Sequence, residues 1–484
     1  NINLNWVDKL RIEQEFKRMP DSTWVLANEN TYVNFYIVKG AQQLYAHQLR
    51  NFDKYQFDVQ NADSIFGLLG PIHELPEATA QTDTFWIHNR HVPLKEKESA
   101  LDDLLAQLRK VPAFNVIIKT AEILITGYIP TTADKDKSKF DFGPMNTTFS
   151  ANHLEGFRMR VGGMTTANLN PHWFGSGYLA YGVNDRKLKY NAKLTYSVNK
   201  KKYHEGESPV NNISAIQEYD VYTPGQDFLF TSKDNMFVAW KVGEPVTMMQ
   251  YIRKTMLQYQ KEWLNGLTLT TWARNENNEA AGTLRYDRYD ADGTLTNLKS
   301  FTNTELGTQL RFAPGERAYN GREGKNSLFN LSKDAPVFKL SHQMGLKNVL
   351  GSDFNYNHTE ISAEKRIWLS SFGHIDALVT AGKVWDKVPF PLLIMPNTNQ
   401  SITIQPQAFN MMRALEFVSD QYVSFYFTYY MKGWILNRIP GVKWLRLREV
   451  ISFSGFYGGL TDKNNPALDP TGLYRFPEGT SPMG

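Results

Sequence analysis

The 484-residue sequence contains no cysteine, which excludes disulfide bridges and metal sites built from thiolates. It also lacks a long apolar run. The best candidate for a membrane-spanning helix, residues 113–130, is too short and carries Lys119 and Glu122. No phosphate-binding loop, dinucleotide fingerprint or G-x-S-x-G nucleophile motif occurs. The ten histidines lack the spacing of metal ligands. We therefore expect no metal, no cofactor and no enzymatic activity.

The sequence also lacks a large net charge, since its 53 Lys and Arg residues nearly balance its 49 Asp and Glu residues. The basic runs at 135–139 and 200–202 lie in predicted loops, and no basic face is apparent, so nucleic acid is not an expected partner. Residues 287–293 are similar to part of a calcium loop but lack the glutamate at its twelfth position. A hairpin turn is the better interpretation of this segment.

The sequence is instead rich in stretches where apolar and polar residues alternate, most clearly at residues 188–198. One face of this stretch would carry Leu188, Tyr190, Ala192, Leu194, Tyr196 and Val198, and the other Lys189, Asn191, Lys193, Thr195 and Ser197. Successive strand side chains point to opposite faces, so the pattern predicts a strand. About 9–11 such residues cross a bilayer at a tilt. Soluble half-buried strands alternate too, so the argument depends on recurrence.

The alternation recurs along most of the chain after residue 145. Strong examples are residues 337–346 and 420–431. Weaker ones are at 157–167, 178–183, 264–274, 281–289, 305–312, 359–369, 374–385 and 447–458. Polar segments of turn composition, such as 275–278 and 314–326, separate them. We expect roughly a dozen strands from this pattern. The aromatic residues expected in girdles at the two membrane interfaces are Trp173, Tyr178, Trp272, Trp368, Trp385, Trp434 and Trp444.

Other segments have different patterns. Residues 7–19 and 94–110 are predicted helices, and residues 24–39 a β segment with a turn at 28–30. Residues 244–263 are predicted to form one amphipathic helix among the strands, because apolar residues recur there at helical spacing after Pro245.

Two groups of short blocks carry a resemblance to a known family. The first comprises Asn152–Thr165, Gly177–Asp185 and Lys189–Tyr190. The second comprises Phe390–Leu393, Phe409–Met412, Glu416–Asp420, Asn437–Pro440 and Leu447–Glu449, and Phe85–Glu98 adds to both. In this order and spacing, the blocks resemble a family of Gram-negative outer-membrane proteins of unknown function. The resemblance implies an N-terminal carboxypeptidase-regulatory-like β-sandwich and a surface-antigen-type barrel, distantly similar to BamA-like assembly and secretion barrels.

Pattern and resemblance together predict a mainly β protein, an antiparallel transmembrane β-barrel in the outer membrane at 141–484, preceded by a mixed α/β periplasmic or plug segment at 1–140. The regulatory-like sandwich would precede residue 1. Residues 461–484 have the composition of a loop. A barrel in lipid has no free edge, so we expect closing strands to be missing from this sequence or supplied elsewhere. The strand at 447–458 should then show an unpaired edge.

Two sets of charged residues are candidate sites. Glu155, Arg158 and Arg160 are predicted to form a charge cluster facing the barrel lumen, while Phe157, Met159 and Val161 face lipid. A structural ion-pair network explains the cluster better than chemistry does. The second set is Glu416, Asp420, Arg448 and Glu449, for which structural pairing is preferred to acid–base catalysis.

Three functions are compatible with these expectations. The first is a non-enzymatic outer-membrane barrel acting in transport, protein export or envelope assembly. The second is a structural barrel with a plugged lumen that anchors a periplasmic complex. The third is a soluble β-rich protein that binds or cleaves carbohydrate. The first two have the lipid bilayer as a partner, with periplasmic or outer-membrane proteins as further expected partners.

Overall fold

The computed structural model describes residues 7–35, 44–55, 57, 81–89, 127–132, 137–229, 231–238, 241, 245–316, 318–320, 328–330, 334–445 and 447–483, with a few single positions between 111 and 123. Contacts divide the chain into two compact units, residues 1–116 and residues 117–484. The boundary predicted at residue 140 falls inside the second unit. Within the described residues, no helix is long and apolar enough to cross a membrane.

The first unit contains a three-stranded antiparallel sheet of β1 (Val7–Arg18), β2 (Trp24–Phe35) and β3 (Leu44–Asn51), and the short helix α2 (Asp83–Asn89). The helix predicted at 7–19 is therefore wrong. Leu10, Ile12 and Phe16 also fit a spacing of two, and β1 pairs with β2 along its length. The turn predicted at 28–30 is wrong too, since β2 continues there, paired on both sides. The helix predicted at 94–110 lies outside the described residues.

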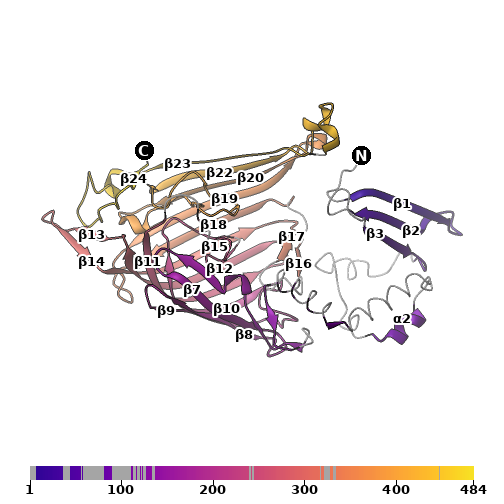
Figure 1. Ribbon diagram of the computed structural model, residues 1–484, viewed down its shortest axis with the longest axis horizontal. Coiled ribbons are helices and arrows are strands. Elements are labelled where there is room, and N and C mark those ends of the chain that lie inside the picture. Colours follow the sequence, from indigo (N-terminus) through magenta and orange to yellow (C-terminus); the bar gives the residue numbers. More distant parts are fainter. Residues whose placement is uncertain are drawn as a thin grey trace. The chain divides into compact units, whose positions relative to one another are not determined.

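The described residues of the second unit are built on one antiparallel sheet of fifteen strands, most of which are neighbours in both sequence and space (Figure 1). Twelve of these described strands are long, and β10 and β11 were not among the strands predicted: β7 (Gly156–Thr165), β8 (Trp173–Gly182), β9 (Leu188–Ser197), β10 (Asn211–Tyr222), β11 (Met248–Glu262), β12 (Leu267–Gly282), β15 (Ser300–Phe312), β18 (Val337–Gly345), β19 (Tyr356–Trp368), β20 (His374–Val384), β22 (Gln421–Tyr430) and β23 (Val450–Gly459). Three short strands complete the sheet on the side of β7: β5 (Phe140–Phe142) and β6 (Phe149–Asn152) pair with β7, and β4 (Ile129–Pro130) pairs with β5. The expectation of a mainly β, antiparallel protein is confirmed.

Three two-stranded sheets are found among the described connections. The strands β13 (Tyr286–Tyr289) and β14 (Leu295–Leu298) form the hairpin that was preferred over a calcium loop at 287–293. The others are β16 (Ala318–Asn320) with β17 (Leu328–Asn330), and β21 (Phe417–Val418) with β24 (Ser481–Pro482).

Two predictions within the sheet are wrong. The helix predicted at 244–263 is strand β11, hydrogen-bonded in register to β10 on one side and β12 on the other. Its apolar residues fit a helical period, but pairing with both neighbours at residues 250–261 satisfies the backbone groups of most of the strand. The turn predicted at 275–278 lies inside the continuous strand β12. There Asn275 and Asn277 donate side-chain hydrogen bonds to Thr304 and Thr302 of the neighbouring strand.

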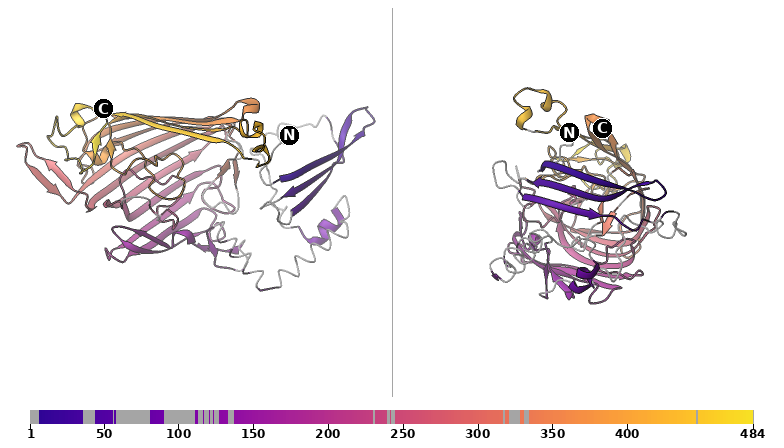
Figure 2. Two further views of the ribbon diagram at one scale, coloured as in Figure 1. Left: turned by 45° about the horizontal axis from the view of Figure 1, so that its top comes forward. Right: turned by 90° about the vertical axis from the view of Figure 1, so that its right-hand side faces the viewer.

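The sheet curves strongly across its strands, so its two faces differ (Figure 2). The inner face lines a cavity and contacts the connections at one end of the strands, whereas most of the outer face is open. Near that end of β10–β12, the outer-face residues Val221, Met249, Tyr251 and Ala281 form a small buried cluster. The strand register places Arg158, Tyr178, Lys193 and Glu218 on the inner face. Large exposed apolar residues of the outer face are Phe157, Met159, Val161, Leu179, Tyr181, Leu188, Leu194, Ile213, Leu257, Leu306, Leu310, Phe338, Leu340, Ile361, Val379, Val423, Phe427, Ile451, Phe453 and Tyr457.

The larger apolar core of this unit lies at one end of the inner face. The described residues of four segments, 223–247, 283–299, 385–420 and 460–483, gather at that end, and we call these segments the cap segments. The buried core residues are Leu284, Tyr286, Phe301, Tyr356, Val384, Val388, Phe390, Leu393, Leu415, Val418 and Tyr474. Most come from the cap segments, while Phe301, Tyr356 and Val384 come from β15, β19 and β20. The cap is therefore packed against the strands as a core.

The sheet has two edges. Among the described strands, β23 pairs with β22 alone in this sheet, and at the other side β7 pairs with β5 and β6. The predicted unpaired edge is thus present at β23. No described pairing joins it to β4–β7, so the described strands form an open sheet rather than a closed ring.

Candidate functional site

The predicted cluster of Glu155, Arg158 and Arg160 is brought together on the inner face near the cap. The Arg158 side chain is 1% exposed, and its Nη1 atom lies 2.8 Å from Glu155 Oε1. The same guanidinium makes a two-pronged contact with Asp220, at 2.8 and 3.0 Å. Arg160 Nη1 lies 2.7 Å from Asp234 Oδ2. The strand β7 thus presents two guanidinium groups to carboxylates from β10 and the first cap segment.

Further charges extend this network across neighbouring strands. Lys189 of β9 lies 2.7 Å from Glu155 and 2.5 Å from Asp185. Lys233 of the cap lies 3.0 Å from Asp220. Gly182 leaves space for the network, because a Cβ at this position would stand 2.8 Å from both Glu155 Cβ and Lys189 Nζ.

The network is electrically balanced. Its cations are Arg158, Arg160, Lys189 and Lys233, and its anions are Glu155, Asp185, Asp220 and Asp234. Removing one member of a buried network leaves an unpaired charge, which costs about 3–5 kcal/mol. Equal numbers of largely buried cations and anions favour a structural role for this network. Its ion pairs hold the first cap segment to the strands β7–β10.

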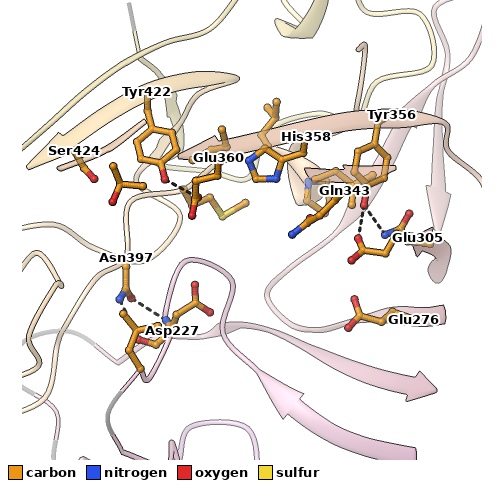
Figure 3. Close-up of a pocket in the computed structure, with 18 of the residues that line it drawn as sticks. Asp227, Glu276, Glu305, Gln343, Tyr356, His358, Glu360, Asn397, Tyr422 and Ser424 are labelled. Carbon is orange, nitrogen blue, oxygen red and sulfur yellow. Dashed lines mark hydrogen bonds between the residues drawn. The ribbon is translucent and has the colours of Figure 1, made fainter. Parts of the chain in front are cut away.

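A second polar region lines a cavity of about 460 Å³ between the inner face and the cap segments (Figure 3). At one side, the carboxylate of Glu305 accepts hydrogen bonds from Trp272 at 2.9 Å and Tyr356 at 2.7 Å, and pairs with Arg274 at 2.7 Å. Asn303 donates to the Tyr356 hydroxyl at 2.9 Å. These contacts hold three strand side chains around one carboxylate, and Asn303 supports the Tyr356 hydroxyl.

At the other side of the cavity, Tyr422 donates a 2.7 Å hydrogen bond to Glu360, and His358 lies between the two sides (Figure 3). The backbone N–H of Asp227 donates to Asn397 Oδ1 at 2.8 Å, and Asn397 donates back to the Asp227 carbonyl at 3.1 Å. This reciprocal contact joins two cap segments 170 residues apart in the chain.

Carboxylates outnumber cations in the cavity lining. The described lining contains four carboxylates but a single Lys or Arg side chain, Arg274. The carboxylates are those of Asp227, Glu276, Glu305 and Glu360. Desolvation raises the pKa of Asp227 above its ordinary value, and the negative charge of Glu360 raises it further. Among the described residues, no group of three or more His, Asp or Glu side chains could hold a metal ion. The lining suits polar or cationic solutes.

The second predicted set, Glu416, Asp420, Arg448 and Glu449, is not brought together. Asp420 is buried at the cap, where Asn464 donates to it at 2.7 Å and Thr461 also bonds to it. Glu449 lies at the opposite end of β22 and accepts from the backbone N–H of Ile435 at 2.9 Å. Arg448 belongs to the same connection as Glu449.

The remaining member of this set, Glu416, accepts from the Arg413 N–H within the cap, at 2.7 Å. Each of the three carboxylates in the set therefore orders its own local segment.

Sequence reasoning missed Asp220 and Asp234, the main partners of Arg158 and Arg160. Asp220 lies on β10, a strand that was not predicted, and 62 residues separate it from Arg158. The alternation of Ile213 and Ala215 with Asn212 and Ser214 was the available signal, although it is short. Asp234 lies in a cap segment, where no periodicity exists to identify it.

Most of the chain matches one known protein family. A profile described as the C-terminal domain of a family of unknown function (DUF5686) matches residues 121–464. The chain belongs to this family. The match covers all the long strands, while residues 1–120 lie outside it.

Among solved structures, the DUF5686 chain is similar to BamA from Haemophilus ducreyi lacking POTRA domains 1–3. The TM-score is 0.41 at 10% sequence identity, over 73% of this chain and 69% of that one. No protein of curated function matches the chain.

Proposed function

We propose that this DUF5686 protein is an outer-membrane β-barrel protein acting in transport, protein export or envelope assembly, with the outer face of residues 117–484 in contact with lipid. One observation carries the proposal, namely the outer face itself. Apolar side chains such as Met159, Leu194 and Phe453 are 51%, 52% and 64% exposed there. They recur on strands from β7 to β23.

Such a face is unfavourable in water. Water-soluble monomers rarely expose a continuous apolar patch larger than a few hundred Å². Strands that are apolar outside and polar inside are instead typical of barrels in a bilayer. On β10–β12 the exposed apolar stretch of the outer face ends toward the cap, where Gln217, Arg253 and Asn277 follow it. A bounded apolar belt of this kind suits a bilayer of limited thickness.

A second candidate, a structural barrel with a plugged interior that anchors a periplasmic complex, is favoured by the cap. The buried core around Phe390 and Tyr474, together with the ion-pair network at Arg158, fills the cap end of the inner face. A filled interior would block free diffusion of large solutes. Conductance of the reconstituted full-length protein in planar bilayers separates the candidates, because a plugged barrel gives little conductance and a transport pore gives stable steps.

Fractionation of cells that express the full-length protein tests the membrane assignment. We expect the protein in the outer-membrane fraction, resistant to carbonate extraction, and faster on gels before boiling than after it. Recovery in the soluble fraction, with unchanged mobility on boiling, would contradict the proposal. That result would favour the soluble carbohydrate-binding alternative.

A further inference from the structure

The connection between β22 and β23, residues 431–449, differs from the other connections at its end of the sheet. We call it the β22–β23 loop. Its base is closed by a 3.1 Å hydrogen bond from the Met431 N–H to the Glu449 carbonyl. The Glu449 carboxylate accepts from the N–H groups of Ile435 and Leu436, and two short 3₁₀ helices follow, Leu436–Arg438 and Lys443–Leu445. The loop is therefore held in a defined conformation.

The loop continues the outer face beyond the ends of the strands. Tyr429, an outer-face residue of β22, donates a 3.0 Å hydrogen bond to the Phe372 carbonyl. The Phe372 ring meets Trp434 of the loop edge-on, with centroids 5.1 Å apart. The guanidinium of Arg438 lies 5.6 Å from the Trp434 centroid. Aromatic contacts thus connect the loop to the apolar belt.

Apolar side chains of the loop are open to solvent. Those at least 42% exposed are Ile435, Ile439, Trp444, Leu445 and Leu447, with Trp444 at 64%. They lead directly into Ile451 and Phe453 on the outer face of β23. Water is an unfavourable surrounding for this group, just as it is for the outer face.

The loop is also strongly basic. It contains Lys432, Arg438, Lys443, Arg446 and Arg448 against the single acid Glu449, so five minus one leaves +4, equal to the net charge of the whole chain. The loop at 198–210, at the same end of the sheet, carries three lysines and two glutamates, a balance of +1. Basic charge is therefore concentrated beside the exposed aromatic and aliphatic side chains.

We propose that the β22–β23 loop lies on the membrane surface and binds anionic phospholipid headgroups. Tryptophan and aliphatic side chains enter the headgroup region, while Lys and Arg pair with phosphates. Each basic residue near an anionic surface strengthens such binding about fivefold. The inference rests on the proposed membrane insertion, and it adds the class of lipid that the protein recognises.

The absence of cysteine permits a direct test in the full chain. A single cysteine at Leu445 carries an environment-sensitive fluorophore, and the protein is reconstituted into vesicles of phosphatidylcholine, with or without phosphatidylglycerol. Quenching by headgroup spin-labelled lipid reports docking of the loop. We expect strong quenching with phosphatidylglycerol, weak quenching without it, and loss of the difference at high salt.

Charge variants show whether the basic residues of the β22–β23 loop, rather than basic residues elsewhere in the protein, are responsible for binding anionic lipid. In the phosphatidylglycerol vesicles, Arg438→Gln with Lys443→Gln should weaken docking about 25-fold, the product of two fivefold losses. The matched control, Lys200→Gln with Lys202→Gln, removes the same charge from exposed positions of the 198–210 loop and should leave docking unchanged.

A second fluorophore position distinguishes failure of the inference from failure of the proposed function. A probe at Leu194, on the outer face of β9, should be quenched by acyl-chain spin labels in every vesicle. If that probe is quenched while the Leu445 probe ignores lipid charge and the double variant, the lipid inference is overturned and membrane insertion stands. If the Leu194 probe is never quenched, insertion fails and the inference fails with it.

Discussion

The side chain of Arg158 contacts carboxylates from three separate parts of the chain, Glu155, Asp220 and Asp234. Its low exposure means that no water replaces these contacts if one partner is lost. The inner face near the cap therefore depends on a few charged side chains that must all be present.

Arg158→Met should destabilise the folded protein by about 3–5 kcal/mol, because the substitution leaves buried carboxylates without their counter-ion. Urea titration of the protein in detergent micelles measures the loss. The control Lys387→Met removes a 2.7 Å pair with Asp469 whose side chains are 33% and 46% exposed, and it should cost about 1 kcal/mol or less. Equal losses for the two variants would contradict a structural role for the network.

Leu194 and Lys193 are adjacent on β9 but lie on opposite faces. Leu194→Arg should weaken insertion into lipid vesicles by about 2–4 kcal/mol, the range for a basic residue near the bilayer midplane. Lys193→Ala loses a partly exposed pair with Glu205 and should cost about 1 kcal/mol or less. Folding yield in vesicles measures both variants. A tolerant Leu194 and a sensitive Lys193 would reverse the assignment of the faces.

Among the elements, β11 shows most clearly how pairing overrides local pattern. Its apolar residues fit a helical period, yet each residue from Met248 to Glu262 has a partner on β12. The strand lies between two others, so a helix here would leave the edges of β10 and β12 without hydrogen bonds.

A cysteine pair can test this register. Gln217 and Thr255 are direct partners on the outer face of β10 and β11, and their side chains bond at 2.6 Å. Gln217→Cys with Thr255→Cys should form a disulfide on mild oxidation, because Cα atoms of opposed strand residues lie about 4.5–5.5 Å apart. Gln217→Cys with Lys254→Cys places the two thiols on opposite faces and should not crosslink. Non-reducing gels show both results, and crosslinking only in the second variant would disprove the register.

At the scale of the whole molecule, the chain divides near residue 116, before β4 and β5. Those short strands belong to the large sheet, since β5 pairs with β7 and the Phe140 ring lies over Gly163, where a Cβ would approach it to 2.4 Å. Asp141, 3% exposed, accepts a 2.7 Å hydrogen bond from Ser138.

Residues 117–484 produced alone should fold with the same heat-modifiable mobility as the full chain. Residues 143–484 lack β4 and β5 and should be less stable by about 1–3 kcal/mol, the usual cost of losing buried packing and hydrogen bonds. Urea titration of both fragments compares them. Equal stability of the two fragments would favour the boundary predicted at residue 140.

The sequence predicts the faces of the strands better than the positions of the aromatic residues. The alternation at 188–198 and 420–431 was sufficient to assign the faces of β9 and β22, and spacing alone placed Arg158 and Arg160 on one side of β7. It did not assign the aromatic residues: Tyr178 and Trp272, expected at the membrane interfaces, lie on the inner face bonded to Asp220 and Glu305. Amphipathic aromatic rings suit either surroundings, so their type alone decides nothing.

The sequence by itself determined which side chains share a face, because alternation along a strand is a property of the extended backbone. Only the tertiary structure decided that 248–262 is a strand and that Asp220, 62 residues away, meets Arg158. The cap was likewise decided by tertiary structure, since Asp227 and Asn397 meet across 170 residues of chain. These features depend on strand register and on long connections folding back onto the sheet, and no local pattern of residues encodes either.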